Sequence, residues 1–280
     1  MKTVTVALGA QAPGDRSYLI KIGEGIRRNL CDLLPAAGVS GRVALVTDSN
    51  VGTLYAQAVA DQLPDNTTIC TLRAGEENKR LAQIEWLCGQ FLEARLDRSS
   101  AIVALGGGVV GDMAGFAASV FMRGVPFVQI PTTIVAQVDS SVGGKTGVNH
   151  PLGKNTIGAF HQPSAVFIDT QFLQTLPGRE LRAGMAEVIK HGVIADAELF
   201  AYLEQNASRI LAKDLAAIEY PVVRSCEIKA DVVSQDEREQ GLRANLNYGH
   251  TFGHGFEGVT HYTHFLHGEG VGLGMHAAAL

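Results

Sequence analysis

Ala101-Ile102-Val103-Ala104-Leu105-Gly106-Gly107-Gly108-Val109-Val110-Gly111 is the stretch that most constrains the fold of this chain. Apolar residues typical of a buried strand run directly into the pattern G-x-G-x-x-G. In a strand–turn–helix unit, such glycines let backbone amides approach a pyrophosphate at the N-terminus of the next helix. The stretch therefore predicts a nucleotide-binding turn, although the pattern alone is not specific.

The usual dinucleotide fingerprint also has an acidic residue about twenty positions later, which would hold a ribose. The segment 126–132 contains none. Asp48, at the end of an earlier strand-like run, is a candidate for that role, although an aspartate there is also a common turn residue. The unit is therefore not an ordinary Rossmann motif.

The rest of the chain alternates strand and helix patterns and then becomes helical. Residues 42–48 form another buried-strand run, apolar residues recur at helical spacing over 81–92, and a last strand is expected at 165–169. After 178 the helical period dominates. The pattern predicts an α/β N-terminal nucleotide-binding domain at 1–172 with a mostly parallel, Rossmann-like sheet, and an all-α C-terminal domain at 178–280. No helix-stop signal precedes residue 280, so the helical domain is expected to be incomplete at its C-terminus.

Composition narrows the classes of partner. The chain has 280 residues, a net charge of −5 and 46% hydrophobic residues. Nucleic acid and anionic membranes are therefore not expected partners, and an anionic substrate requires a local basic cluster. The four cysteines have no paired spacing, the N-terminus lacks the apolar core of a signal peptide, and the apolar stretch 113–138 is interrupted by arginine and proline. A cytoplasmic location is expected.

Three groups in the second half are candidate metal ligands: Glu187, His250 and His267. His254 lies four residues after His250, so the two share a helix face, and spacing does not choose between His254 and His267. The H-x-x-x-H pair has Thr251 where metallopeptidases have glutamate, which disfavours peptide hydrolysis. A divalent metal together with a dinucleotide indicates redox chemistry on a hydroxylated substrate.

Residues 139–149 are polar and glycine-rich, and Lys154-Asn155 follow soon after. A P-loop is excluded because its first glycine would fall at Asp139. Cations on a flexible glycine frame are suited to binding a phosphate or carboxylate, and a mobile surface loop is the alternative. Lys229 and Arg243 are two further cations, upstream of His250, that could bind an anion. The alternative interpretation is that they lie on a charged, exposed helix face.

Seven segments form an ordered set of motifs: 106–112, 131–133, 138–149, 152–155, 186–190, 247–254 and 266–269. Together they closely resemble the 3-dehydroquinate synthase family, which are lyases of the shikimate pathway to aromatic amino acids and a branch of the sugar-phosphate cyclases. The resemblance covers nearly the whole chain.

The resemblance implies conversion of 3-deoxy-D-arabino-heptulosonate 7-phosphate to 3-dehydroquinate and phosphate. The steps are transient oxidation of a hydroxyl by NAD, phosphate elimination, re-reduction and intramolecular aldol closure. It also implies one divalent metal, zinc or cobalt, an anionic sugar phosphate as the small-molecule partner, and a homodimer. The active site is expected in the cleft between the two domains.

The resemblance also implies roles for individual residues. The metal ligands are Glu187, His250 and His267, which leaves His254 for the substrate. The substrate and catalytic positions are Lys145, Asn155, His254 and Arg123 (from a neighbouring subunit) for the phosphate, Arg243, Lys229 and Asn247 for the carboxylate and hydroxyls, and Lys190 and Asp139 beside the reacting carbons. Together with Asp48, the positions expected to hold NAD are Gly75, Glu76, Lys79, Gly107, Gly108, Val109, Gly111, Asp112, Thr132, Thr133, Lys145, Lys154, Phe172 and Thr175.

Two departures from the family pattern, and three alternatives, accompany this interpretation. Ala74 stands where the family often has aspartate, and family members continue beyond residue 280 with further helices and a basic residue that approaches the substrate phosphate. The alternatives are a sister sugar-phosphate cyclase, a metal-dependent polyol dehydrogenase, and an inactive chain that binds NAD and metal. A neutral polyol does not require the cation cluster, which disfavours the dehydrogenase.

Overall fold

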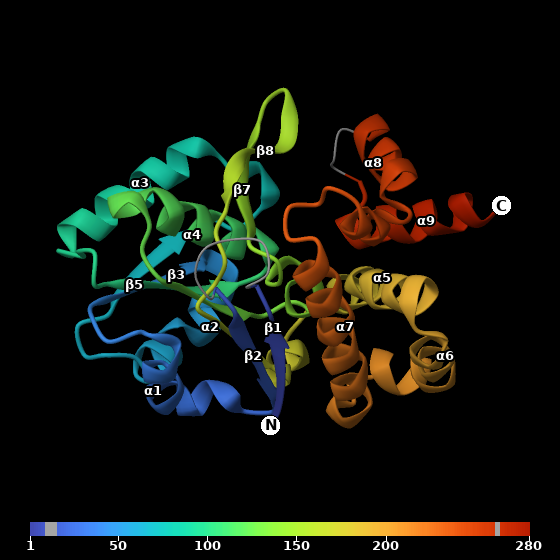
Figure 1. Cartoon of the computed structure of the whole chain (residues 1–280), viewed down its shortest axis with the longest axis horizontal. Helices are drawn as coiled ribbons and strands as arrows, with labels where there is room; N and C mark the ends of the chain where they lie inside the picture. Colours follow the sequence, from blue (N-terminus) through green and yellow to red (C-terminus); the bar gives the residue numbers. More distant parts are fainter. Residues whose placement is uncertain (9–15, 261–263) are drawn as a thin grey trace.

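A computed structural model describes residues 1–8, 16–260 and 264–280. Its main feature is a seven-stranded sheet of order β1-β2-β9-β6-β5-β3-β4, drawn with the other elements in Figure 1. All neighbouring strands are parallel except β1 and β2. The strands are β1 (Lys2–Val6), β2 (Tyr18–Gly23), β3 (Val43–Asp48), β4 (Thr68–Leu72), β5 (Ala101–Gly106), β6 (Phe127–Pro131) and β9 (Ala165–Asp169). The predicted, mostly parallel sheet is confirmed.

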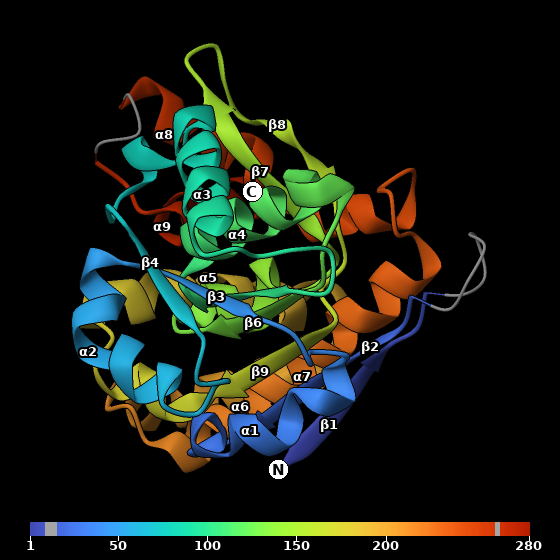
Figure 2. The same cartoon turned by 90° about the vertical axis from the view of Figure 1, so that its left-hand side faces the viewer.

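Helices cover both faces of this sheet, as parallel strands require. They are α1 (Leu30–Leu33), α2 (Ser49–Ala60), α3 (Leu81–Glu93) and α4 (Gly108–Val120). Figure 2 shows α3 and α4 on one face and α1 and α2 on the other. Phe91 and Phe127 lie in the core under α3 and α4, and Leu45 and Phe167 lie in the core on the opposite face.

The strand order places a topological switch point at the predicted nucleotide turn. The chain runs from β3 to β4 on one side and then to β5 and β6 on the other, so the connections leave β3 and β5 in opposite directions. In open α/β sheets, ligands bind in the crevice at the carboxyl ends of two such strands. Asp48 ends β3 and Gly106 ends β5, which puts the glycine turn and the start of α4 at that crevice.

The second half of the glycine-rich segment at 139–149, expected as part of a flexible frame, is the first strand of a β-hairpin, which corrects the sequence interpretation. After a π-helical turn (Ala136–Ser140), β7 (Lys145–His150) pairs antiparallel with β8 (Gly153–Phe160). Gly147 and Gly158 face each other in this pair, and a Cβ on either would lie 2.0–2.5 Å from backbone oxygen of the other strand. The two glycines therefore allow β7 and β8 to pack closely. The β7–β8 hairpin projects toward α8 in Figure 1.

Among the residues that the structure describes, five α-helices follow β9. They are α5 (Gly178–Ala195), α6 (Ala197–Leu211), α7 (Leu215–Gln235), α8 (His250–Val259) and α9 (His267–Ala279). Asp196 caps α6 by accepting from the amide of Leu199, and Asp214 caps α7 by accepting from that of Ala216. The helical C-terminal part is confirmed. Within the described residues, no helix has the length and apolar character needed to cross a membrane.

The helical part shares a core with one end of the sheet. Apolar residues of β1, β2 and β9, such as Val6, Ile22 and Ile168, belong to the same buried cluster as Val188 of α5 and Val222 of α7. Figure 1 shows α7 alongside β1, which it contacts. Because this apolar contact is extensive, side chains of the two parts can meet in a defined geometry.

Close packing of α9 on α5 depends on Gly268, and this gives a stability prediction. A Cβ on Gly268 would lie 1.8 Å from the carbonyl oxygen of Ala183. We expect Gly268→Ala to destabilise the chain by about 1–3 kcal/mol or more, because backbone must move to admit the methyl group. Denaturant unfolding measures this. Gly255→Ala in α8 is the matched control, since nothing lies within 4 Å of its Cβ, and should be neutral or stabilising by up to about 1 kcal/mol. Equal stability of the two variants would contradict the packing argument.

Candidate active site

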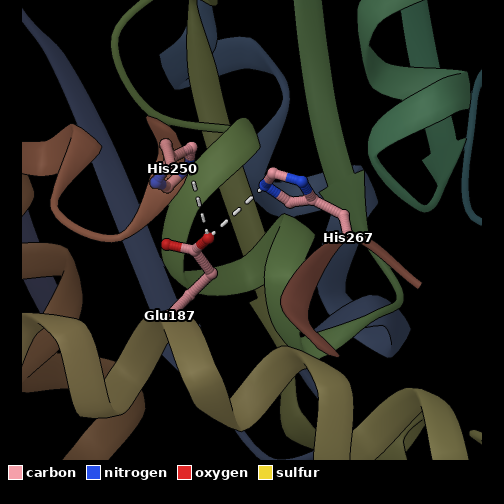
Figure 3. Close-up of side chains that lie close together, drawn as sticks. All are labelled: Glu187, His250 and His267. Carbon is pink, nitrogen blue, oxygen red and sulfur yellow. Dashed lines mark ion pairs between the residues drawn. The ribbon is translucent and has the colours of Figure 1, made fainter. Parts of the chain in front are cut away.

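Glu187, His250 and His267 meet although they lie on three different helices. Glu187 Oε1 is 3.7 Å from His250 Nε2 and 3.5 Å from His267 Nε2, and Figure 3 shows both imidazoles directed at the carboxylate. His250 is the first residue of α8 and follows the N-cap residue Gly249, which has a φ of 80°. His267 is the first residue of α9 and follows the N-cap residue Leu266. The backbone positions of both histidines are therefore set by the first turn of a helix.

The geometry of these three groups fits a divalent metal ion. Zinc bonds of about 2.0–2.2 Å place two tetrahedral ligands about 3.3–3.6 Å apart, close to the observed separations. Glu187 is fully buried, and its Oε1 has no hydrogen-bond partner in the described part of the chain. A buried carboxylate oxygen without a partner is costly unless a cation satisfies it. Three ligands also leave a coordination position open, as in catalytic zinc sites.

The charges of Glu187 and His267 depend on each other. Burial alone would raise the pKa of Glu187, but the neighbouring His267, Lys190 and His250 lower it to about 2. Burial alone would lower the pKa of His267, but Glu187 and Glu257 raise it to about 9. The carboxylate is therefore ionised at neutral pH and available to a cation.

Lys190 and His191 lie beside Glu187 on α5. Lys190 is buried and pairs with Glu187 Oε2, three residues earlier on the helix. His191 is also buried, and neither of its ring nitrogens has a hydrogen-bond partner among the described residues. Burial and the charge of Lys190 lower the pKa of His191 to about 4, so this imidazole is neutral.

A second group contains the half-buried Asp139 and the buried cations Lys229 and Arg243. Lys229 Nζ donates to the backbone oxygen of Asp139 at 2.7 Å and also pairs with its carboxylate. Burial would raise the pKa of Asp139, but Lys229 and Lys190 hold it well below its usual range. Arg243 is 2% exposed and donates to the carbonyls of Gly143, at 3.1 Å, and Glu237. The exposed helix face proposed as the alternative is therefore wrong for both cations.

Lys145 and Asn247 share one carboxylate. Lys145 on β7 pairs with Glu239, and Asn247 Nδ2 donates to the other oxygen of Glu239 at 2.8 Å. Glu239 has a φ of 58°, which is uncommon for a non-glycine residue. The Glu239 carboxylate thus pairs with two side chains, Lys145 and Asn247, that are expected to bind the substrate.

On the nucleotide side, Lys79 connects two other expected site residues. Its buried Nζ donates to Asp112 Oδ2 at 2.5 Å and to Asn155 Oδ1 at 2.6 Å. Burial raises the pKa of Asp112, and Lys79 opposes that rise. Asn155, with φ of 53°, is held by its amide, which donates to Asn149 Oδ1 at 2.8 Å. Glu76 accepts from Asn149 Nδ2 at 2.7 Å, so the segment around Glu76 meets the β7–β8 hairpin near its turn.

The glycine turn is tightly packed by its neighbours. A Cβ on Gly107 would lie 3.1 Å from Thr133, one on Gly108 3.0 Å from Ser140, and one on Gly111 2.5 Å from Gln129. Thr132 is buried, and its hydroxyl has no hydrogen-bond partner within the described ranges. Val109 is half-buried against the core under α3 and α4. The turn therefore presents backbone rather than side chains.

Some expected nucleotide residues also have structural contacts. Asp48 Oδ1 accepts from the amides of Asn50 and Val51 as the N-cap of α2, so the turn-residue alternative describes its contacts. The Phe172 ring is buried in the core against Tyr55, which is incompatible with ring contact to a nucleotide. Thr175 bonds to the Tyr55 hydroxyl at 2.6 Å.

The remaining expected residues are at the edges of the site. Gly75 has φ of 114°, and a Cβ there would lie 2.4 Å from the Glu77 carboxylate, so only glycine fits this turn. Arg123 is exposed, with φ of 67°, in the turn after α4. Lys154 lies 3.5 Å from Glu257. His254 is exposed on α8, with its ring centroid 5.5 Å from that of His250.

Two residues in the site were missed by the sequence analysis. Glu257 is buried and its Oε1 lies 3.1 Å from His267 Nδ1. Its position seven residues after His250 and three after His254 is helical spacing, so the sequence carried a signal for it. Glu239 lies after the end of α7 in a segment that is not helical, so it has no such spacing to a predicted site residue. Its role follows from tertiary contacts.

Comparison with known proteins identifies the family of the chain. The family model for the 3-dehydroquinate synthase N-terminal part matches residues 69–183, and that for the C-terminal part matches residues 184–280. A 3-dehydroquinate synthase of Saccharophagus degradans is 53% identical over 98% of this chain and 75% of the relative. One of Pelotomaculum thermopropionicum is 53% identical over 98% of this chain and 74% of the relative.

Solved structures extend the similarity. A 2-deoxy-scyllo-inosose synthase complexed with carbaglucose-6-phosphate, NAD+ and Co2+ has a TM-score of 0.87 at 29% identity, over 98% of this chain and 75% of that one. The 2-epi-5-epi-valiolone synthase of Streptomyces hygroscopicus, with NAD+ and Zn2+ bound, has a TM-score of 0.85 at 30% identity, over 95% and 74% of the two chains. The fold and the candidate site together define a sugar-phosphate cyclase. Within that class, the chain belongs to the 3-dehydroquinate synthase family.

Proposed function

We propose that this chain converts 3-deoxy-D-arabino-heptulosonate 7-phosphate to 3-dehydroquinate and phosphate. The observation that carries the proposal is the Glu187–His250–His267 cluster, with its carboxylate buried, beside buried cations, in a chain about half identical to named 3-dehydroquinate synthases. A substrate with a phosphate and a carboxylate matches a site rich in lysine and arginine, whereas a neutral polyol does not require such a cluster of cations.

We infer that Glu187, His250 and His267 hold one zinc or cobalt ion and that NAD lies at the carboxyl ends of β3 and β5. When bound, the ion would polarise a substrate hydroxyl and NAD would accept and return its hydride. The backbone of the turn at Gly107 and Gly108 would receive the pyrophosphate. The other proposed nucleotide residues are Asp48, Gly75, Glu76, Lys79, Val109, Gly111, Asp112, Thr132, Thr133, Lys145, Lys154, the backbone of Phe172, and Thr175.

The proposed substrate contacts follow from charge. Lys145, Asn155, His254 and a partner subunit's copy of Arg123 would bind the phosphate. Arg243, Lys229 and Asn247 would bind the carboxylate and hydroxyls, and binding would displace Glu239 from Lys145 and Asn247. Asp139, ionised between Lys229 and Lys190, would hold its charge beside the reacting carbons. The protein then contributes mainly position and fixed charge.

We also propose the division into domains at 1–172 and 178–280, a homodimer, and a cytoplasmic location. The strands of the main sheet end at Asp169 and α5 begins at Gly178, which supports the first of these. The dimer and the location rest on the family resemblance.

The test is phosphate release by the purified chain with NAD and zinc or cobalt. We expect release from the heptulosonate 7-phosphate and none from sedoheptulose 7-phosphate or glucose 6-phosphate. A chelator should abolish release, and added zinc or cobalt should restore it. Release from another substrate instead would indicate a sister cyclase, and no release from any of the three would indicate an inactive chain that binds NAD and metal.

A further inference from the structure

A fourth side chain, Glu257, contacts the proposed metal site from outside the ligand set. It lies on α8 and is 1% exposed. Its Oε1 is 3.1 Å from Nδ1 of His267, whose other nitrogen, Nε2, faces Glu187 at 3.5 Å. An imidazole that donates from Nδ1 to a carboxylate has its Nε2 lone pair directed at the opposite side, toward Glu187.

The other oxygen of Glu257 faces a different part of the molecule. Lys154 Nζ, on β8, lies 3.5 Å from Glu257 Oε2. The β7–β8 hairpin also carries Lys145, which pairs with Glu239. One buried carboxylate therefore contacts both a proposed metal ligand and the hairpin that carries a proposed substrate contact.

The close packing of α8 on α9 makes the contact between Glu257 and His267 possible. A Cβ on Gly270 would lie 3.2 Å from both Cγ and Oε1 of Glu257, and a Cβ on Gly253 would lie 2.9 Å from the carbonyl of Gly270. The two helices approach closely because neither position has a side chain, and this brings the carboxylate within reach of the His267 ring.

We propose that Glu257 is a positioning residue, which accepts a hydrogen bond from His267 Nδ1 and so holds Nε2 in place for the metal. Through Lys154 it also links that ligand to the β7–β8 hairpin. The inference rests on the proposed metal site at Glu187, His250 and His267.

The competing arrangement is a metal bound by Glu257 itself. His254, Glu257 and His267 also have ligand atoms within 4.8 Å of one another. In that arrangement His267 Nδ1 would bind the ion, and the buried carboxylate of Glu187 would face only the Nε2–H of His267, at 3.5 Å, without an ion. The positioning role pairs Glu257 with the Nδ1–H of His267 and Glu187 with the ion. His254 is exposed whereas Glu187 is buried, which also favours the Glu187 site.

The test is zinc affinity, from competition with a chromophoric chelator, and the visible spectrum of the cobalt-loaded chain. We expect Glu257→Ala to lower zinc affinity about 10- to 100-fold, the usual effect of removing a partner of a metal-bound histidine, and to alter the cobalt spectrum. Glu257→Gln should lose less, because its amide oxygen still accepts from Nδ1. His254→Ala should leave affinity and spectrum unchanged. Thermal unfolding checks that each variant is folded, and Glu257→Gln serves if Glu257→Ala does not fold.

The outcomes separate this inference from the proposed function. Wild-type affinity and spectrum in folded Glu257 variants would overturn the positioning role while leaving the metal site standing. Loss of affinity in both Glu257→Ala and His254→Ala would also overturn it and assign the metal to the second cluster. A wild-type chain that binds neither zinc nor cobalt would refute the metal site, and the inference with it.

Discussion

Replacing His250 by alanine should lower the affinity of the chain for zinc or cobalt by more than about 100-fold, since loss of a mere partner of a ligand costs 10- to 100-fold. Glu187 Oε1 and His267 Nε2 would remain, 3.5 Å apart, with two ligands where three are needed. Phosphate release should fall in parallel, because the reaction is proposed to require the ion.

The fold should survive this change. His250 is the first residue of α8, its side chain is 14% exposed, and its backbone turn depends on Gly249. Metal content by mass spectrometry, chelator competition and thermal unfolding would be measured on the same preparation. His276→Ala, exposed in the last turn of α9, is the control and should bind metal as wild type does. Unchanged metal affinity in His250→Ala would remove this residue from the site.

The parts of the fold that the sequence predicted are those set by local pattern. The strand at 101–106 and the helix after its glycine turn follow from a short apolar run and closely spaced glycines. The helix at 81–93 follows from its apolar period. Each of these patterns lies within a single strand or helix and its adjoining turn, so no knowledge of tertiary contacts is needed to recognise it.

The hairpin was missed because its glycines serve tertiary contacts that the sequence does not display. Gly143, with φ of 97°, leaves space for Arg243, since a Cβ there would lie 2.4 Å from Nη2. Gly147 and Gly158 allow the two strands to approach closely. Glycine is rare in strands, so composition alone predicted a loop.

The site shows the same limit. Spacing put His250 and His254 on one helix face but left the third ligand open, because His267 reaches Glu187 only through the packing of α9 on α5. Asp48 and Phe172 occupy expected positions at strand or turn ends, but their contacts as an N-cap and a core ring depend on neighbours distant from the turn pattern. Family resemblance supplied the ligand set that spacing did not.

Lys145→Ala should lower kcat/KM for phosphate release by about 100- to 1,000-fold, the range seen when one group that stabilises developing charge is removed. The residue lies on β7, and its side chain is 48% exposed, so its ammonium group can reach a bound anion. Its present partner, Glu239, also accepts from Asn247, and a substrate phosphate would replace that carboxylate.

A structural role for Lys145 makes a different prediction, and the two can be separated. An exposed ion pair of this kind contributes about 0–1 kcal/mol, so Lys145→Ala should leave thermal unfolding nearly unchanged. Metal content should also be unchanged, because Lys145 contacts none of the three proposed ligands in the contacts described for it. Lys2→Ala, an exposed lysine on β1, is the matched control and should keep the wild-type rate. A near-normal rate in Lys145→Ala would mean that its pairing with Glu239 only fastens the hairpin, whereas loss of rate with intact metal and stability would assign Lys145 to the substrate.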